Sequence, residues 1–292
     1  MQEKLSNLLE KSIVGSRLFQ DTFSHIRYED ELTRYRLESS WKKHFPTVMP
    51  KAVILNKGEP TYDWVNDEKL GLILDEVFET GYVISFLESL QQFLSIREVF
   101  ESVMSNFRVN SAAACSVDCF SDVWDGSFIK SIPIYVKQND AILGIQIYID
   151  EVELSNPLGS KKGKHKVSVF YWVLMNLPSK FRSSLRSIQL LGVVSCKLLK
   201  QRGVEVFLRP FLDDLIHLHE GVSLTVRNEK RLWFGILLHF AGDIPAASFV
   251  GGFKEGVGFA NLPCRSCMIH RDHLDKIKTD AACVKKFLTK FK

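Results

Sequence analysis

The sequence lacks any long apolar run. The two longest, residues 141–149 and 235–242, are interrupted by Gln146 and His239, and neither approaches the roughly 18 residues of a membrane-spanning helix. The first residues, MQEKLSNLLEKS, carry charges where a secretory signal would need its apolar core. We therefore expect a protein that is not secreted, makes no membrane contact and resides in the nucleus or the cytoplasm.

Cysteine is also scarce, with six in 292 residues. In a long chain that is not secreted, this number favours reduced thiols over disulfides. Neither sign of charge dominates either: 38 Lys and Arg face 34 Asp and Glu, for a net charge of +4. With 46% hydrophobic and 25% charged residues, the composition is that of a globular protein, which excludes a wholly disordered chain, a collagen and a coiled-coil rod.

The small basic excess is concentrated near the end of the chain. From Cys264 to Lys292 there are eight Lys and Arg against three Asp, a net +5, so the other 263 residues sum to −1. A second basic cluster consists of Lys161, Lys162, Lys164 and Lys166. Such segments can contact nucleic acid, and they can equally be ordinary solvated surface.

The first third of the chain has a helical pattern. Residues 70–78 and then 83–94 have the apolar spacing of amphipathic helices. Ser95 is expected to begin a further helix, with Glu98 completing a capping box, and residues 1–14 form another candidate helix. Residues 45–60 are expected to form a loop. We interpret residues 1–105 as a helical N-terminal region and residues 106–133 as a linker, because turn chemistry replaces the helical pattern there.

After Pro133 the pattern favours β-strands. Strands are expected at residues 141–150, 166–177, 185–196 and 231–243, with an amphipathic helix at 203–220 that Gly221 ends. The order βββαβ predicts an α/β fold.

Two of these predicted strands end in an aspartate, Asp150 and Asp243. If the strands are neighbours, both carboxylates emerge at one sheet edge and could hold divalent metal, Mg²⁺ or Mn²⁺. The alternative is that each is an ordinary strand-end residue. Glu151 and Glu153 compete with Asp150, but alternation along a strand points them to the other side.

A second cluster combines thiols with imidazoles. Cys264 and Cys267 form a CxxC pair, and His270 and His273 follow within ten residues. This donor set suits tetrahedral zinc, with Cys283 as a further candidate ligand. Reduced cysteines beside surface histidines are the alternative. A redox role is less favoured because no βαβ unit frames the CxxC pair.

Longer stretches of the chain resemble one known family. The string YIDEVELSNPLGSKKGKHKVSVFYWVLMNLPSKFRSSLRSIQLLGVV, from Tyr148 onward, is similar to the transposase core of CACTA-like DNA transposons, in particular those of animals. The similarity continues through VEVFLRPFLDDLIHLHEGV and GDIPAASFVGGFKEGVGFANLPCRSCM. YVISFLESLQQFLSIREVF and WDGSFIKSIPIY are also of the family type, so the resemblance covers residues 80 to 275.

The resemblance implies a ribonuclease H-like mixed sheet, with its first and fourth strands side by side, over residues 134–250. The first two catalytic acids would then fall on Asp150 and Asp243, which would hold Mg²⁺ or Mn²⁺. The CxxC pair would belong to a zinc-bearing insertion, so residues 251–292 would be a zinc-type insertion and basic tail. Double-stranded DNA is the implied partner, contacted by Lys161, Lys162, Lys164 and Lys166.

The family also uses a third acid, on a helix after a fifth strand, and nothing after Asp243 offers that strand and helix. We therefore expect a transposase fragment whose catalytic set is incomplete, with DNA cleavage and strand transfer as the reaction of the intact parent. A non-catalytic, transposon-derived zinc protein that binds DNA or protein is the alternative. A zinc-stabilised interaction module with no nucleic-acid role comes third. Assembly into a homo-oligomer is left open.

Overall fold

The computed structural model describes residues 48–57, 61–67, 69, 71–112, 120–138, 141–154, 166–253, 257–265 and 267–276. The chain separates into two units, residues 1–48 and 49–292. Only Val48 of the first unit is described, so the candidate helix at residues 1–14 lies outside the described residues. The described helices and strands all belong to the second unit.

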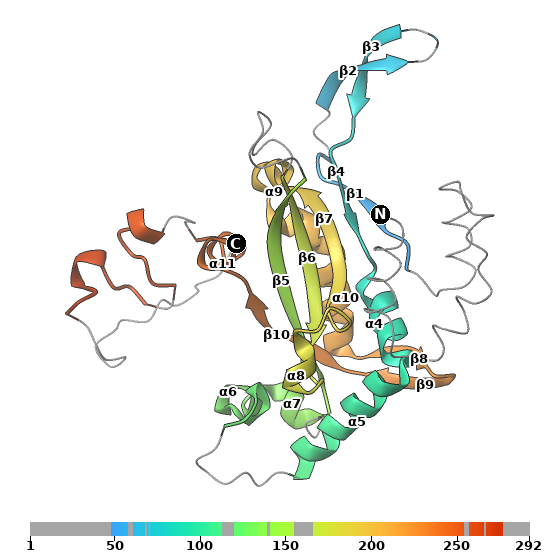
Figure 1. Cartoon of the computed structure of the whole chain (residues 1–292), viewed down its shortest axis with the longest axis vertical. Coiled ribbons are helices and arrows are strands. Elements are labelled where there is room, and N and C mark those ends of the chain that lie inside the picture. Colours follow the sequence, from blue (N-terminus) through green and yellow to red (C-terminus); the bar gives the residue numbers. More distant parts are fainter. Residues whose placement is uncertain are drawn as a thin grey trace, which may run out of the picture. The chain divides into compact units, whose positions relative to one another are not determined.

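A six-stranded mixed sheet organises this unit and confirms the predicted α/β class (Figure 1). Its strand order is β1-β4-β7-β6-β5-β10. The central strands β5, β6 and β7 are antiparallel neighbours, whereas β10 runs parallel to β5. The strands span β1 (Lys51–Ile54), β4 (Thr80–Val83), β5 (Leu143–Glu153), β6 (Lys166–Leu174), β7 (Gln189–Ser195) and β10 (Gly235–Ala241).

One face of the sheet carries the main hydrophobic core. Leu143, Ile145, Ile147 and Ile149 alternate along β5 and all point into this core. The helices that pack there are α4 (Phe86–Ser95), α5 (Arg97–Ala112), α9 (Cys196–Arg202) and α10 (Val204–Glu220). The two expected helices over residues 83–94 and 203–220 are therefore confirmed as α4 and α10, and Gly221 ends α10 with a φ of 111°.

A smaller apolar cluster covers the opposite face at one end of the sheet. Trp124 lies at its centre and stacks on Tyr135, with ring centroids 6.1 Å apart. The elements that supply it are the 3₁₀ turn η2 (Val123–Asp125), α6 (Ser127–Lys130) and α7 (Pro133–Lys137). Gly144 of β5 makes room for this cluster, because a Cβ there would meet Leu238 at 2.4 Å and Trp124 at 2.7 Å.

A buried amide ties this end of the sheet together. The Asn176 side chain accepts a hydrogen bond from the Gly144 N–H at 2.9 Å. It also donates to the Ile142 carbonyl at 3.0 Å and to Asn106 Oδ1, on α5, at 2.8 Å. Nearby, the Trp124 indole N–H donates to the Met175 carbonyl at 3.1 Å. One side chain thus satisfies backbone groups of the chain entering β5 and links them to a helix.

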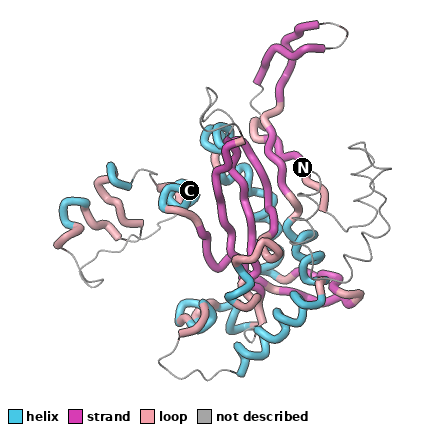
Figure 2. The backbone as a smooth tube through the Cα atoms, viewed as in Figure 1, coloured by secondary structure: helices cyan, strands magenta, loops and turns pink. Residues whose placement is uncertain are grey.

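One of the predicted helices is a β-hairpin in the structure. The division of the chain into four regions stays a prediction. Residues 70–78 are not a helix: β2 (Thr61–Asp67) and β3 (Gly71–Val77) pair as an antiparallel hairpin. Leu72, Ile73 and Leu74 satisfy both periodicities, and pairing with the β-favouring Tyr62 and Trp64 decides between them. Figure 2 shows this ribbon as strand.

Other local predictions were also wrong. Ser95 ends α4 and donates to the Gln91 carbonyl, so it is not the cap of α5, which begins at Arg97. The loop predicted at 45–60 contains β1. Residues 106–133, interpreted as a linker, include the end of α5, η2 and α6, and Trp124 among them is 3% exposed.

The predicted strand at 231–243 is in fact two strands in different sheets. β9 (Glu229–Trp233) pairs with β8 (Val222–Val226) as a separate hairpin, and β10 begins at Gly235 beside β5. Arg227 and Asn228 form the tight hairpin turn, both with positive φ. The other strands were placed correctly in kind, although β6 ends at Leu174 and β7 begins only at Gln189.

Candidate active site beside strands β5 and β10

Asp150 lies on β5, and Asp243 follows the end of the adjacent, parallel strand β10. The last pair between β5 and β10 is Tyr148 with Ala241. Each aspartate therefore comes two residues after a member of this last pair. Asp150 is not at a strand end as predicted, because β5 runs on to Glu153. Asp243 does lie just past the end of its strand, which is Ala241.

A β-bulge in β10 sets this register. Leu237 pairs with Ile145, and His239 pairs with Gln146, so Leu238 is an extra residue. Without it, the same count would bring Asp243 opposite Glu151. The bulged Leu238 packs against the Trp124 cluster, so the second apolar cluster supports the register that brings the two aspartates together.

Asp243 also begins a helix, α11 (Ile244–Val250), as its N-cap. Its Oδ1 accepts a hydrogen bond from the Ala246 N–H at 2.8 Å, and Pro245 in the first turn suits a helix start. The cap fixes the carboxylate where the chain leaves β10, which is a structural role that Asp243 has whether or not it binds a ligand.

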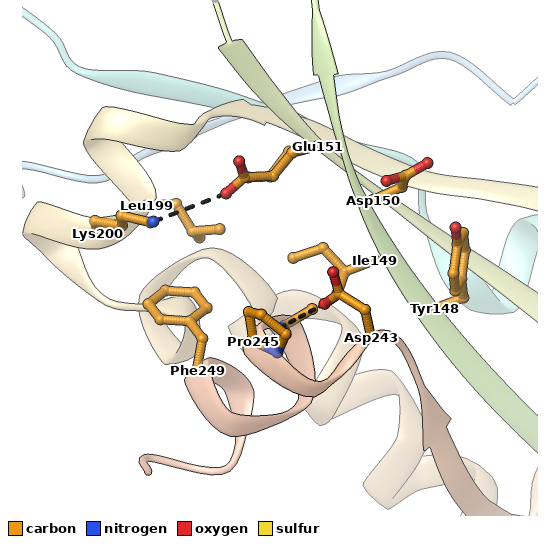
Figure 3. Close-up of a pocket in the computed structure, with 11 residues that line it drawn as sticks. Tyr148, Ile149, Asp150, Glu151, Leu199, Lys200, Asp243, Pro245 and Phe249 are labelled. Carbon is orange, nitrogen blue, oxygen red and sulfur yellow. Dashed lines mark hydrogen bonds and ion pairs between the residues drawn. The ribbon is translucent and has the colours of Figure 1, made fainter. Parts of the chain in front are cut away.

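Both aspartates line one pocket of about 360 Å³. Its wall is built from β5, β6, α9 and α11, and its lining residues include Tyr148, Asp150, Glu151, Ser168, Lys200, Asp243 and Phe249 (Figure 3). The Asp150 and Asp243 side chains are exposed, so both carboxylates are accessible to a ligand from solvent.

The acidic residue next to Asp150 points away from it. Figure 3 shows Tyr148 and Asp150 on one side of β5 and Glu151 on the other, directed toward Lys200. Glu151 lies 3.9 Å from Lys200 Nζ and 3.7 Å from Lys166 Nζ. These two ammonium groups offset its charge, which leaves Asp150 and Asp243 as the other two carboxylates that line the pocket.

The pKa of the Tyr148 phenol reflects the negative charges of Asp150 and Asp243. Burial raises the pKa of the Tyr148 phenol above its ordinary value, and the neighbouring Asp150 carboxylate, which also accepts its hydrogen bond, raises the pKa further, with a smaller contribution from Asp243. Tyr148 stacks on Tyr171 of β6, with centroids 5.9 Å apart. The phenol therefore stays protonated and is able to hold the Asp150 carboxylate in place.

The donor set fits a hard divalent cation only in part. Carboxylate oxygens are the ligands that Mg²⁺ and Mn²⁺ prefer, and two of them share the wall of this pocket. Across the described residues, however, no three His, Cys, Asp or Glu side chains are arranged to hold a metal ion. The described residues thus place two carboxylates at one pocket wall, and a complete site would require a further oxygen donor.

The residues predicted to bind zinc lie in the described part of the C-terminal segment. Cys267 is buried, whereas Cys264 and His270 are half-buried and His273 is exposed. The two imidazole rings are 6.1 Å apart, and His270 Nδ1 lies 3.2 Å from Asp272 Oδ2. The described ranges do not gather these side chains into a metal-holding group, and Cys283 lies outside them, so the zinc site stays a prediction.

Of the predicted DNA-contacting lysines, Lys161, Lys162 and Lys164 lie outside the described residues. Lys166 opens β6 close to Glu151, on the same strands as the pocket. Sequence reasoning did not identify Tyr148, Ser168 or Lys200 as pocket residues. Tyr148 was within reach of it, since a residue two positions before Asp150 shares its side of the strand. Lys200 could not be placed without the position of α9.

No helix among the described residues is long and apolar enough to cross a membrane. A scan against models of protein families and a search of curated proteins both find no match to this chain.

Proposed function

We propose that this chain carries part of the catalytic core of a DDE-type DNA transposase related to CACTA-like elements. The observation that carries the proposal is that Asp150 and Asp243, from β5 and from the end of the adjacent β10, line one pocket. The reaction of the intact parent would be metal-dependent cleavage of DNA phosphodiesters followed by strand transfer.

The sheet supports a ribonuclease H-like assignment. Three consecutive antiparallel strands, β5, β6 and β7, are followed by two helices, the β8–β9 hairpin and then β10, which lies parallel to β5. The proposed fold is expected to place its first and fourth strands side by side, with a catalytic acid on or just after each. Asp150 on β5 and Asp243 just after β10 suit this expectation, and β1 and β4 would be additions at the far edge of the sheet.

In this proposal Asp150 and Asp243 hold Mg²⁺ or Mn²⁺, with Tyr148 orienting Asp150 and the α11 cap orienting Asp243. The metal, when bound, supplies activation of a water or 3′-hydroxyl and stabilisation of the leaving oxygen. Lys200 stands at the pocket wall, where its charge can attract a phosphate. The two carboxylates alone leave a metal pair short of ligands, so this chain by itself is proposed to be incomplete for cleavage.

Cation binding by the wild-type chain tests the site directly. Titration with Mn²⁺ at neutral pH, followed by the electron paramagnetic resonance signal of free Mn²⁺, is expected to show binding that Asp150→Asn or Asp243→Asn weakens at least about tenfold. Asp213→Asn, on the surface of α10, is the matched control and should bind as the wild type does. Equal binding by all four proteins would refute the metal site.

DNA binding tests the partner. The chain is expected to bind duplex DNA with little sequence preference and with an affinity that falls steeply with salt. Replacing the predicted contact lysines by Gln should reduce the slope of log K against log salt by about 3 to 4, the replaced residues being Lys161, Lys162, Lys164 and Lys166. Four control lysines should leave the slope nearly unchanged: Lys57, Lys180, Lys197 and Lys230.

The same protein is expected not to nick labelled duplex DNA in Mg²⁺ or Mn²⁺, because the described residues bring only two matching carboxylates to the pocket. Nicking that disappears in both Asp150→Ala and Asp243→Ala would contradict the proposed incompleteness and place a third ligand in this chain. Affinity for DNA that does not change between low and moderate salt would instead contradict the DNA-binding role.

A second candidate is a non-catalytic, transposon-derived protein that binds DNA or protein and contains zinc. The feature that favours it is the set of two cysteines and two histidines within ten residues, Cys264, Cys267, His270 and His273, in the C-terminal segment. Cys264 and Cys267 would hold the zinc with His270 and His273. Purified chain that contains stoichiometric zinc and binds DNA, yet shows no Mn²⁺ binding dependent on Asp150, would favour this candidate over the first.

A further inference from the structure

A second surface of the molecule lies away from the pocket, on the β2–β3 hairpin. The two strands pair along their whole length, from Thr61 with Val77 to Asp67 with Gly71. The hairpin continues from β1 and β4 (Figure 1). At this junction Asn56 is buried and donates to the Val77 carbonyl at 3.1 Å.

The base of the hairpin is held firmly. The Asn56 side chain also accepts from the Glu79 N–H at 3.0 Å, and the Glu79 carboxylate pairs with Arg202 of α9 at 2.7 Å. Both partners of this ion pair are largely buried. The residues at the base of the hairpin are therefore tied together by buried polar contacts.

One face of the hairpin is apolar and exposed. The register pairs Trp64 with Leu74, and the adjacent pairs on the same face include Tyr62 and Leu72. These four large side chains are exposed by 62%, 57%, 60% and 66% in that order. An isolated two-stranded hairpin is only marginally stable in water, so a face of this kind gains most from being covered.

The charges on the hairpin exclude nucleic acid as its partner. Residues 61–77 contain five Asp and Glu against one Lys, although the whole chain has a net charge of +4. Asp63 and Asp75 alternate with the apolar residues and therefore lie on the opposite face. A phosphate backbone would be repelled by these acidic residues. In a pair of hairpins that meet through their apolar faces, Asp63 and Asp75 of both copies would lie on the outer faces, away from the contact.

We infer that the Tyr62–Trp64–Leu72–Leu74 face, here called the hairpin face, is a dimerisation surface that packs against the same face of a second copy of this chain. Taking roughly 200 Å² for a large side chain, the exposed fractions leave about 500 Å² of apolar surface on each copy. Two copies would cover about 1,000 Å², which reaches the lower limit for a specific interface. This inference is independent of the proposed catalytic function.

A two-fold axis between the hairpins makes the surface self-complementary. Trp64 of one copy can lie over Leu74 of the other, so that each large ring meets an aliphatic side chain.

Sedimentation of the full chain between about 1 and 100 µM tests this inference. The wild type is expected to pass from monomer to dimer over that range, as suits an interface of the smallest specific size. Trp64→Thr/Leu74→Thr, which keeps residues that favour strands, should raise the dissociation constant at least about 30-fold. Val65→Thr/Ile73→Thr alters the neighbouring cross-strand pair on the opposite face and is the matched control, expected to dimerise normally.

Fluorine NMR of the chain labelled with fluorotryptophan adds a local measurement that does not depend on the stability of a variant. The Trp64 resonance, identified by its loss in the variant, should shift with concentration and be accessible to a soluble quencher only in dilute samples. A wild type that stays monomeric at 100 µM would overturn the inference. So would a Trp64 resonance that is shielded in the monomer, because residues of the same chain would then cover the face.

Discussion

Replacing Phe86 by alanine is expected to destabilise the protein by about 3–5 kcal/mol. Phe86 is 1% exposed and begins α4. Its ring packs edge-on against Trp172 of β6 at 5.2 Å and against Phe211 of α10 at 5.0 Å between centroids. The ring thus joins two helices to the central sheet, and its removal leaves a cavity that three separate elements would have to close.

Urea unfolding monitored by circular dichroism measures this effect. Phe128→Ala is the matched control, since that phenylalanine is 72% exposed and its loss should change the free energy of unfolding by no more than about 0.5 kcal/mol. Similar stability losses in the two variants would mean that the contacts of the Phe86 ring with β6 and α10 do not stabilise the core.

Asn176→Ala is expected to cost about 2–4 kcal/mol for a different reason. The substitution removes little apolar volume, but it leaves the buried Gly144 N–H and the Ile142 carbonyl without the partners they have in the wild type. A buried donor and acceptor that lose their hydrogen bonds carry their full desolvation penalty. The same change releases Asn106 of α5 from this hydrogen bond, so the link between this helix and the sheet is lost as well.

Asn66→Ala is the control in the same unfolding experiment, because Asn66 is exposed on the β2–β3 hairpin. Its free energy of unfolding should lie within about 0.5 kcal/mol of the wild-type value. Asn176→Asp is a further test, since an aspartate keeps the acceptor for Gly144 but, when ionised, cannot donate to Ile142. At low pH, where the carboxyl is protonated and can donate, the free energy of unfolding of Asn176→Asp should lie between those of the wild type and Asn176→Ala. Full stability of Asn176→Ala would show that water replaces the amide.

The central sheet was predictable because its strands are apolar on nearly every residue that faces the core. Ile145, Ile147 and Ile149 alternate in β5 within a run that is too short and too β-branched for a helix. The β2–β3 hairpin was not predictable in the same way. Leu72, Ile73 and Leu74 fit a helix as well as a strand, and only pairing with residues 61–67 decides. Nor does the sequence mark the break at Phe234 between β9 and β10.

The sequence predicts which two aspartates belong to the candidate site, but not how they lie relative to each other. That Asp150 and Asp243 follow apolar runs is visible in the sequence. The position of Asp243 beside β5 follows a bulge at Leu238, and Leu238 packs against the cluster around Trp124, more than a hundred residues earlier. The direction of Glu151 toward Lys200 likewise depends on where α9 lies. Whether the pocket binds metal and DNA stays a prediction.

The strand order has a consequence for the route by which the protein folds. β5, β6 and β7 are consecutive, so they can form as a local meander with short loop closures. β10 must return to β5 from the far side of α9 and α10, and β4 must pair with β7 from the other half of the chain. Such non-local pairings are slow. We therefore expect Asp150 to enter its strand early and Asp243 to be placed only when β10 pairs, so that the pocket forms late in folding.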